Sequence, residues 1–245
     1  MFQHWGHPNV RRVRDFVTGE APLLAAIAII SGLILAFLQI ADEMLEGEME
    51  QFDNSILMLF RDPTNVDRVI GPEWVHEMVR DITALGSFSL LGLIVLGVCV
   101  YLVMARMWAT AVLVVVSVLS GTLLSTVLKM SYNRPRPDLT VMSHQFTSSF
   151  PSGHAMLSAV TFLTLGAVLS QLAPTRALRI FTIGAAIFLT AIVGSSRIFM
   201  GVHYPSDVLA GWCLGAAWAL ICSTAALLLQ RRGAVASPPK TDRAR

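Results

Sequence analysis

Three short segments of the chain together contain the side-chain types that phosphoryl transfer requires. They are Lys129–Pro137 (KMSYNRPRP), Pro151–His154 (PSGH) and Ser196–Asp207 (SRIFMGVHYPSD). A phosphoryl group needs cations that neutralise its oxygens, a nucleophile that attacks phosphorus and an acid that protonates the leaving group. The lysine, arginines, histidines and carboxylate of these segments are candidates for all of these roles.

The first segment offers cations on a stiff backbone. Arg134 and Arg136 alternate with prolines, which disfavour a helix and favour an extended conformation. An arginine can bind two phosphate oxygens at once, whereas Lys129 would act as a point charge. The alternative interpretation is a basic cap on the apolar stretch that precedes this segment.

The second segment leads directly into an apolar stretch and is expected to begin a helix. Pro151 suits a first helical turn, and Gly153 permits close backbone approach. The free N–H groups and positive dipole end of a helix attract anions, so Ser152 and the neighbouring amides could bind phosphate. His154 could donate a proton to the departing oxygen. The alternative is an ordinary helix start with a histidine at the membrane interface.

The third segment combines a cation with a histidine and a carboxylate. Arg197 supplies the cation, and His203 precedes Asp207 by four residues. If a helix begins near Pro205, the carboxylate can reach one imidazole nitrogen, fix the tautomer and leave the other nitrogen free to attack phosphorus. The alternative is a capped helix with Asp207 near its positive end.

The elements that position these segments are expected to be membrane-spanning helices. The chain of 245 residues is 54% hydrophobic and 14% charged, with a mean hydropathy of +0.64. Soluble domains carry roughly 25% charged residues, so the composition indicates an all-α polytopic membrane protein. Each of six apolar stretches approaches the ~20 residues that cross a bilayer as a helix. These stretches are Ala21–Ile40, Leu85–Ala105, Trp108–Leu128, Ala155–Ala173, Ala177–Ser195 and Val208–Leu229.

The basic residues predict the orientation of these spans. Of the 18 lysines and arginines, 11 lie before the first stretch, after the sixth, in the second-to-third and fourth-to-fifth connections or, in the case of Arg179, at the start of the fifth stretch. An excess of basic residues marks the cytoplasmic side. Residues 1–20 and 231–245 are therefore expected to be cytoplasmic, on either side of one membrane domain over residues 21–230.

The connection over residues 41–84 is expected to be an outer loop, and it contains 11 acidic residues against three arginines. Apolar residues at helical spacing near residues 52–60 and 74–79 predict short amphipathic helices on the membrane surface. Asp53 or Asn54 would begin the first of these helices, and Asp62-Pro63 would end it. We expect the acidic run from Asp42 to Asp53 to be a solvated face without a catalytic role.

Counting the crossings brings the three segments together. The first follows the third stretch, the second opens the fourth stretch, and the last joins the fifth and sixth stretches. All of them therefore meet one face of the membrane, whichever orientation the chain adopts. With a cytoplasmic N-terminus, that face is the outer one.

Taken together, the three segments resemble the signature of the type 2 phosphatidic acid phosphatase superfamily, the lipid phosphate phosphatases. Its pattern is K-x6-R-P, P-S-G-H and S-R-x5-H-x3-D, and this chain matches every fixed position. The resemblance implies six membrane helices, an outward-facing site and a mechanism without a metal or other cofactor. It implies that His203 is the nucleophile and forms a phosphohistidine, that His154 is the acid and base, and that Asp207 orients His203. The implied phosphate ligands are Lys129, Arg136, Ser152, Gly153 and Arg197.

The expected activity is hydrolysis of a lipid phosphate or diphosphate at the outer face of a bacterial inner membrane. Candidate substrates are undecaprenyl diphosphate, phosphatidylglycerol phosphate and phosphatidic acid. Phosphotransfer to another acceptor uses the same residues and stays open, as does a non-catalytic phospholipid carrier, although a carrier has little need for the histidines. The net charge of +2 gives no argument for nucleic acid, and no protein partner can be read from the sequence. The cysteines lie within spans, without metal-ligand spacing.

Overall fold

In a computed structural model, which describes residues 8–137 and 147–231 and the side chains within 20–137 and 147–230, the chain is almost entirely helical. The expected all-α membrane fold is confirmed. Short two-stranded pairing of β1 with β2 interrupts the helices only between α2 and α3. The elements are α1 (Pro8–Glu46), α2 (Glu50–Met58), β1 (Arg61–Asp62), β2 (Asn65–Val69), α3 (Glu73–Ala84), α4 (Phe88–Met104), α5 (Trp108–Ser131), α6 (Gly153–Leu172), α7 (Arg176–Phe199) and α8 (Pro205–Arg231).

The predicted spans correspond to α1 and α4–α8. Among the described residues, five helices are long and apolar enough to cross a membrane alone, namely α1, α5, α6, α7 and α8. The sixth span needs α4 together with α3, because α4 has only 17 residues and the two helices meet at a 50° bend. This bend, which we call the α3–α4 elbow (residues 85–87), was not predicted. Ser87 caps α4 by accepting a hydrogen bond from the Leu90 N–H at 3.3 Å.

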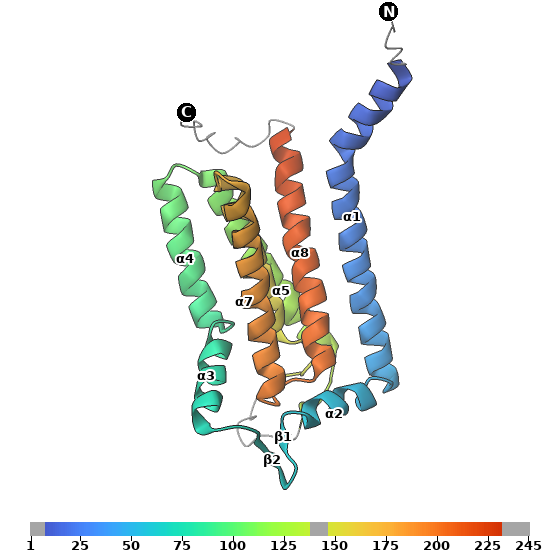
Figure 1. Cartoon of the computed structure of the whole chain (residues 1–245), viewed down its shortest axis with the longest axis vertical. Coiled ribbons are helices and arrows are strands. Elements are labelled where there is room, and N and C mark those ends of the chain that lie inside the picture. The colour runs from blue at the N-terminus through green and yellow to red at the C-terminus, as the bar shows by residue number, and fades with distance from the viewer. Residues whose placement is uncertain (1–7, 138–146, 232–245) are drawn as a thin grey trace, which may run out of the picture.

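Helix α6 forms the centre of the bundle. In its most apolar window 61% of the residues are buried, against 6% in α1, so α6 is surrounded by protein and α1 faces its surroundings. Helices α5, α7 and α8 all pack against α6, while α1 packs against α8 and α3 against α7. Figure 1 shows that α1 begins and α8 ends at the same end of the bundle, with α2, the strands and α3 at the other end.

Small residues bring α6 and α8 into close contact. Gly211 and Gly215, one turn apart on α8, face the α6 backbone. A Cβ atom on Gly215 would lie 2.6 Å from the carbonyl oxygen of Met156 and 2.7 Å from Cβ of Ala159. Such small-residue spacing is typical of tightly packed membrane helices, whose backbones approach each other closely.

We therefore expect Gly215→Ala to lower the stability of the fold by roughly 1–3 kcal/mol, the usual cost of overpacking. Gly97→Ala on α4 is the matched control, since nothing lies within 4 Å of a Cβ at that position. Helix propensity alone favours alanine over glycine by up to about 1 kcal/mol, so the control should be as stable as the parent or more so. Thermal unfolding of both purified variants in detergent measures the difference. Equal unfolding temperatures would contradict close α6–α8 packing.

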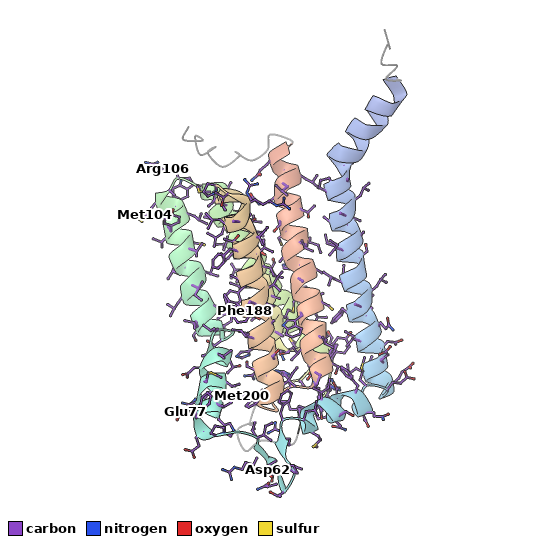
Figure 2. All side chains as sticks on the ribbon, viewed as in Figure 1. Asp62, Glu77, Met104, Arg106, Phe188 and Met200 are labelled. Atoms are coloured by element: carbon purple, nitrogen blue, oxygen red, sulfur yellow. The ribbon has the colours of Figure 1, made fainter. Side chains whose placement is uncertain are left out.

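The predicted outer loop contains the two short helices, but its details differ from the prediction. Helices α2 and α3 confirm the predicted amphipathic helices, although α2 begins at Glu50 and ends before the predicted Asp62-Pro63 boundary. The pairing of β1 with β2 was not predicted. Figure 2 shows Asp62 and Glu77 at this end of the bundle and Arg106 at the opposite end, in keeping with the charge asymmetry. The prediction was wrong for Asp53, which is fully buried rather than solvated.

Candidate active site

The predicted segments meet at one end of the bundle, where α5 and α7 end and α6 and α8 begin. The backbone N–H of Ser152 donates to the Asp207 carbonyl at 2.9 Å, which joins the second and third segments. The Lys129 ammonium donates to the Ser148 carbonyl, also at 2.9 Å, which joins the first segment to the residues just before the second segment. The three segments thus meet at one face of the bundle, as the count of membrane crossings predicts.

The start of α8 places Asp207 beside His203. As expected, the helix begins at Pro205, and Asp207 lies in its first turn. The Tyr204 N–H donates to Oδ2 of Asp207 at 2.9 Å, so the carboxylate also caps the helix. The same Oδ2 lies 3.4 Å from Nδ1 of His203. Ser149 donates to Oδ2 as well, and its hydroxyl lies 3.3 Å from Nδ1.

The surroundings of His203 select one tautomer of its neutral ring. Nη1 of Arg136 lies 3.2 Å from Nε2 of His203. A guanidinium can only donate, so Nε2 must accept in this contact and carry the lone pair. The ring proton is then on Nδ1, where Asp207 and Ser149 lie. This is the arrangement in which Nε2 can act as a nucleophile.

The imidazole of His203 is neutral near physiological pH. Burial lowers its pKa from 6.5 to about 4, with Arg197 and Arg136 acting in the same direction. The hydrogen bond and charge of Asp207 oppose this shift only in part. A buried base that has lost its proton is ready to attack without prior deprotonation.

The predicted phosphate ligands surround the start of α6. A Cβ atom on Gly153 would lie 3.1 Å from Cε of Lys129, so the glycine gives the lysine room beside the helix end. Nη1 of Arg197 donates to the Thr83 hydroxyl on α3 at 3.1 Å. Nε of Arg197 and the Ser152 hydroxyl are buried and have no hydrogen-bond partner in the part of the chain that the structure describes. Buried polar groups are usually hydrogen-bonded, so these two unpaired groups are candidates for binding phosphoryl oxygens.

His154 lies in the first turn of α6, half-buried beside the α3–α4 elbow. A Cβ atom on Gly86 would lie 3.3 Å from Cδ2 of His154 and would collide with Val193. The elbow therefore fits against the histidine only because residue 86 is a glycine. His154 lies within electrostatic range of His203, Arg197, Lys129 and Arg136.

Sequence reasoning missed several residues that complete the site. Ser149 precedes the second segment and contacts both His203 and Asp207. Thr83 orients Arg197 from a helix that was expected to lie on the membrane surface. Arg134 was noted only as a cation, yet it forms ion pairs with Asp53 at 2.7 Å and with Asp207 at 2.6 Å. Residue type and local spacing carry no signal for contacts of this range.

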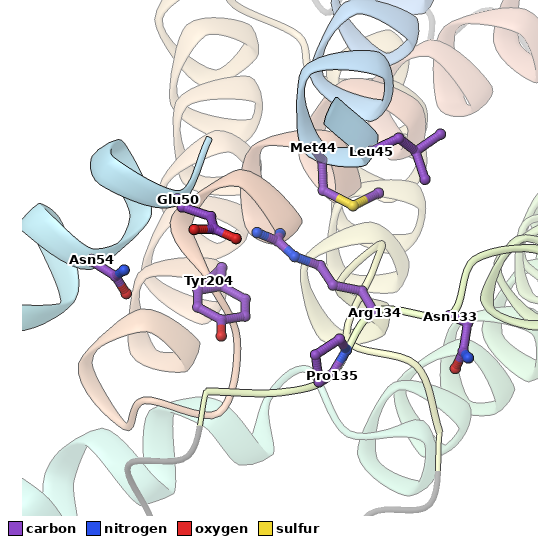
Figure 3. Close-up of a pocket in the computed structure, with 8 residues that line it drawn as sticks. All are labelled: Met44, Leu45, Glu50, Asn54, Asn133, Arg134, Pro135 and Tyr204. Atoms are coloured by element: carbon purple, nitrogen blue, oxygen red, sulfur yellow. The ribbon is translucent and has the colours of Figure 1, made fainter. Parts of the chain in front are cut away.

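A cavity of about 480 Å³ opens next to Arg134, between the end of α1, helix α2 and the start of α8. Figure 3 shows Arg134 among the residues that line it, with Glu50 and Asn54 on α2 and Tyr204 before α8. The Arg134 guanidinium lies 4.2 Å from the centre of the Tyr204 ring. The cavity contains none of the predicted catalytic or phosphate-binding residues, so it adjoins the site without being its reaction chamber.

The chain is similar to proteins that are named as phosphatases. A family model described as "PAP2 superfamily" matches residues 110–230. Phosphatidylglycerophosphatase B of Bacillus subtilis (strain 168) is 32% identical over 191 residues, which are 75% of this chain and 87% of that protein. A lipid A 1-phosphatase of Rhizobium johnstonii is 36% identical over 124 residues, 46% of each chain.

A solved structure supports the same relationship. The crystal structure of the "first transmembrane PAP2 type phosphatidylglycerolphosphate phosphatase from Bacillus subtilis" superposes with a TM-score of 0.69 and 27% sequence identity. The match covers 79% of this chain and 93% of that structure. It therefore includes residues outside the 110–230 region that the family model matches.

Proposed function

Because the chain belongs to the PAP2 superfamily, we propose that it is an integral-membrane phosphatase that hydrolyses the phosphate or diphosphate group of a membrane lipid. The observation that carries the proposal is the pairing of a neutral, buried His203 with Asp207 at the helix ends where the cations and His154 gather. A nucleophile, its orienting carboxylate, a proton donor and phosphate ligands are then all present together.

In the proposed reaction, Nε2 of His203 attacks phosphorus while the bond from phosphorus to the leaving oxygen breaks. His154 transfers its proton to that oxygen, so the dephosphorylated lipid departs. A water molecule then gives its proton to His154 and attacks the phosphohistidine, which releases phosphate and regenerates Nε2. Throughout the reaction, Asp207 stabilises the positively charged ring by accepting a hydrogen bond from Nδ1, and the Ser149 hydroxyl lies beside the same nitrogen.

Cationic side chains neutralise the charge of the phosphoryl group in this proposal. Lys129, Arg136 and Arg197 come from two of the three segments, and the amides at the start of α6 with Ser152 add neutral donors. These groups take the place that metal ions occupy in other phosphoryl-transfer sites, so the scheme needs no metal or cofactor.

The relatives support a phospholipid as the substrate. Phosphatidylglycerol phosphate is the first candidate, because the Bacillus protein named for it shares most of its length with this chain. Undecaprenyl diphosphate and phosphatidic acid are the alternatives. The charge asymmetry supports a bacterial inner membrane with cytoplasmic termini and a site that faces the periplasm or exterior.

Phosphate release by the purified protein from each of these lipids in mixed micelles tests the proposal. We expect release from at least one of them, with phosphatidylglycerol phosphate the most rapid. A phosphorylated acceptor in place of free phosphate would instead indicate phosphotransfer. Binding of all three lipids without turnover would contradict an enzyme and indicate a carrier.

The depressed pKa of His203 predicts an unusually acid-tolerant reaction. Protonated imidazole cannot attack, so the lowering to about 4 means that kcat/KM falls only as the pH drops towards that value. An ordinary histidine would already lose activity below about pH 6.5. The phosphate of the substrate also titrates, with a second pKa of about 6. The kcat/KM measured at each pH must therefore be divided by the fraction of substrate present as the dianion. If the corrected kcat/KM began to fall near pH 6.5, the prediction would be contradicted. This comparison uses only samples that regain their activity when they are returned to neutral pH.

A further inference from the structure

We propose that Asp53, on α2 and outside all three segments, is a positioning residue for the reaction: with Arg134, it holds Asp207 in the orientation that positions His203. The inference rests on the proposed function, because it assigns a role within that reaction. Helix α2 would then be part of the catalytic machinery rather than a surface helix.

Among the residues that the structure describes, the hydrogen bonds of the Asp53 carboxylate all lead towards the active site. Its side chain is fully buried and accepts from Arg134 Nη2 at 2.7 Å. It also accepts from the Ser206 N–H at 2.9 Å and the Ser206 hydroxyl at 2.6 Å. The N–H belongs to the first turn of α8, so Asp53 caps this helix from another element. A buried carboxylate is costly unless it is paired, and here each oxygen is.

Arg134 connects this carboxylate to the catalytic one. Its Nη1 donates to Asp207 Oδ1 at 2.6 Å and to the Ser206 hydroxyl at 2.8 Å, while Nη2 is taken by Asp53. Burial lowers the pKa of Arg134, but the charges and hydrogen bonds of Asp207 and Asp53 outweigh it and raise the pKa above its ordinary value. The planar guanidinium presents its donors in a fixed fork, so anchoring one side fixes the other.

The oxygens of Asp207 are divided between two tasks. Oδ1 accepts from Arg134, and Oδ2 accepts from Tyr204 and Ser149 and faces Nδ1 of His203. The Arg134 contact thus sets the rotation of the carboxylate, which leaves Oδ2 on the side of the imidazole. Any movement of the guanidinium transmits directly to this rotation.

Asp53 keeps Arg134 from an alternative partner. The cavity beside Arg134 is also lined by the Glu50 carboxylate, one helical turn before Asn54 on the same helix (Figure 3). If the charge of Asp53 is removed, the guanidinium is free to turn into this cavity and pair with Glu50. Asp207 then loses its Oδ1 anchor.

The matched pair Asp53→Asn and Asp42→Asn tests the proposal. Both remove one carboxylate from the predicted outer loop, but Asp42 is exposed at the end of α1. We expect Asp53→Asn to lower kcat by up to about 100-fold, the cost of a small misplacement at a reacting centre, with KM changed less than about 3-fold. Asp42→Asn should match the wild type. Unchanged kcat in Asp53→Asn would overturn the proposal.

A second background separates positioning from a general structural effect. In an Asp207→Asn protein, Asp53→Asn should cause no further loss of kcat, because its effect passes through Asp207. An equal further loss in that background would overturn the proposal. If Asp53→Asn does not fold, Ser206→Ala tests the same link with the charge of Asp53 retained. We then expect a several-fold lower kcat that also depends on Asp207, and wild-type kcat would overturn the proposal.

Chemical rescue supplies a readout that a loss of stability would not give. Arg134→Ala removes the guanidinium beside a cavity large enough to admit a free guanidinium ion. Millimolar guanidinium should restore kcat of Arg134→Ala at least several-fold but not that of Asp53→Asn. Failure of rescue would overturn the proposal that Asp53 positions Asp207 through Arg134. If the wild type released no phosphate from any lipid, the proposed function itself would fail, which distinguishes the two results.

Discussion

Replacement of His203 by alanine should abolish phosphate release while leaving the protein folded. His203 supplies the nucleophilic Nε2 in the proposed reaction. No other imidazole in the described residues contacts both Asp207 and Ser149 through its second ring nitrogen. Removal of a nucleophile from a comparable hydrolase triad costs about 10⁶-fold in kcat. We therefore expect turnover of His203→Ala to fall below detection in a phosphate-release assay.

The covalent step can be measured separately from turnover. Brief reaction of the wild type with a ³²P-labelled lipid, followed by alkaline quenching, should leave acid-labile label on the protein. His203→Ala should carry none. The control is His76→Ala, since His76 lies on α3, where its Nε2 lies 3.2 Å from the Ile70 carbonyl oxygen and its ring packs edge-on against Phe199. Wild-type turnover or labelling in His203→Ala would show that another group attacks phosphorus.

Replacement of His154 by glutamine should slow both chemical steps by about 10²–10⁴-fold, the usual contribution of a general acid or base. Glutamine retains a polar group at the start of α6 but transfers no proton. In the first step, formation of the phosphohistidine, the loss should be largest for a lipid alkoxide, which needs protonation as it leaves. In that step the loss should be much smaller for p-nitrophenyl phosphate, whose leaving group is already stable as an anion.

The same variant should accumulate the intermediate when the leaving group is good. Phosphorylation by p-nitrophenyl phosphate would proceed, but hydrolysis needs a base to activate water, and His154 is the proposed base. A burst of p-nitrophenol equal to the enzyme concentration, followed by slow turnover, is the expected time course. An equal loss of rate for both substrates, without a burst, would assign His154 to binding rather than proton transfer.

The parts of the fold that the sequence predicts are those that depend on local properties. A run of about 20 apolar residues specifies a span without reference to its neighbours, and Pro205 begins its helix as proline commonly does. The meeting of the three segments also follows from the sequence, because crossing parity is a topological constraint. These features therefore agree with the structure.

The features that were missed depend on distant contacts. Asp53 stands in an acidic run of low hydropathy, so its local sequence indicates exposure. Its burial results from Arg134 and Ser206, which lie 81 and 153 residues further along the chain. Likewise, the elbow at Gly86 is set by His154 and Val193, which belong to other helices. A single sequence carries no record of such pairings.

The contact between Arg136 and His203 bears on which phosphates a membrane enzyme leaves alone. The Arg136 guanidinium covers the lone pair of Nε2, the proposed attacking nitrogen. An incoming group must therefore be anionic enough to draw Arg136 onto its own oxygens before the nitrogen becomes reactive. A terminal phosphate with two charges competes well for the arginine, whereas the singly charged diester of an ordinary phospholipid competes poorly. The proposed nucleophile thus stays covered by Arg136 in the presence of a large excess of diester phospholipids. A dianionic terminal phosphate exposes it by binding Arg136.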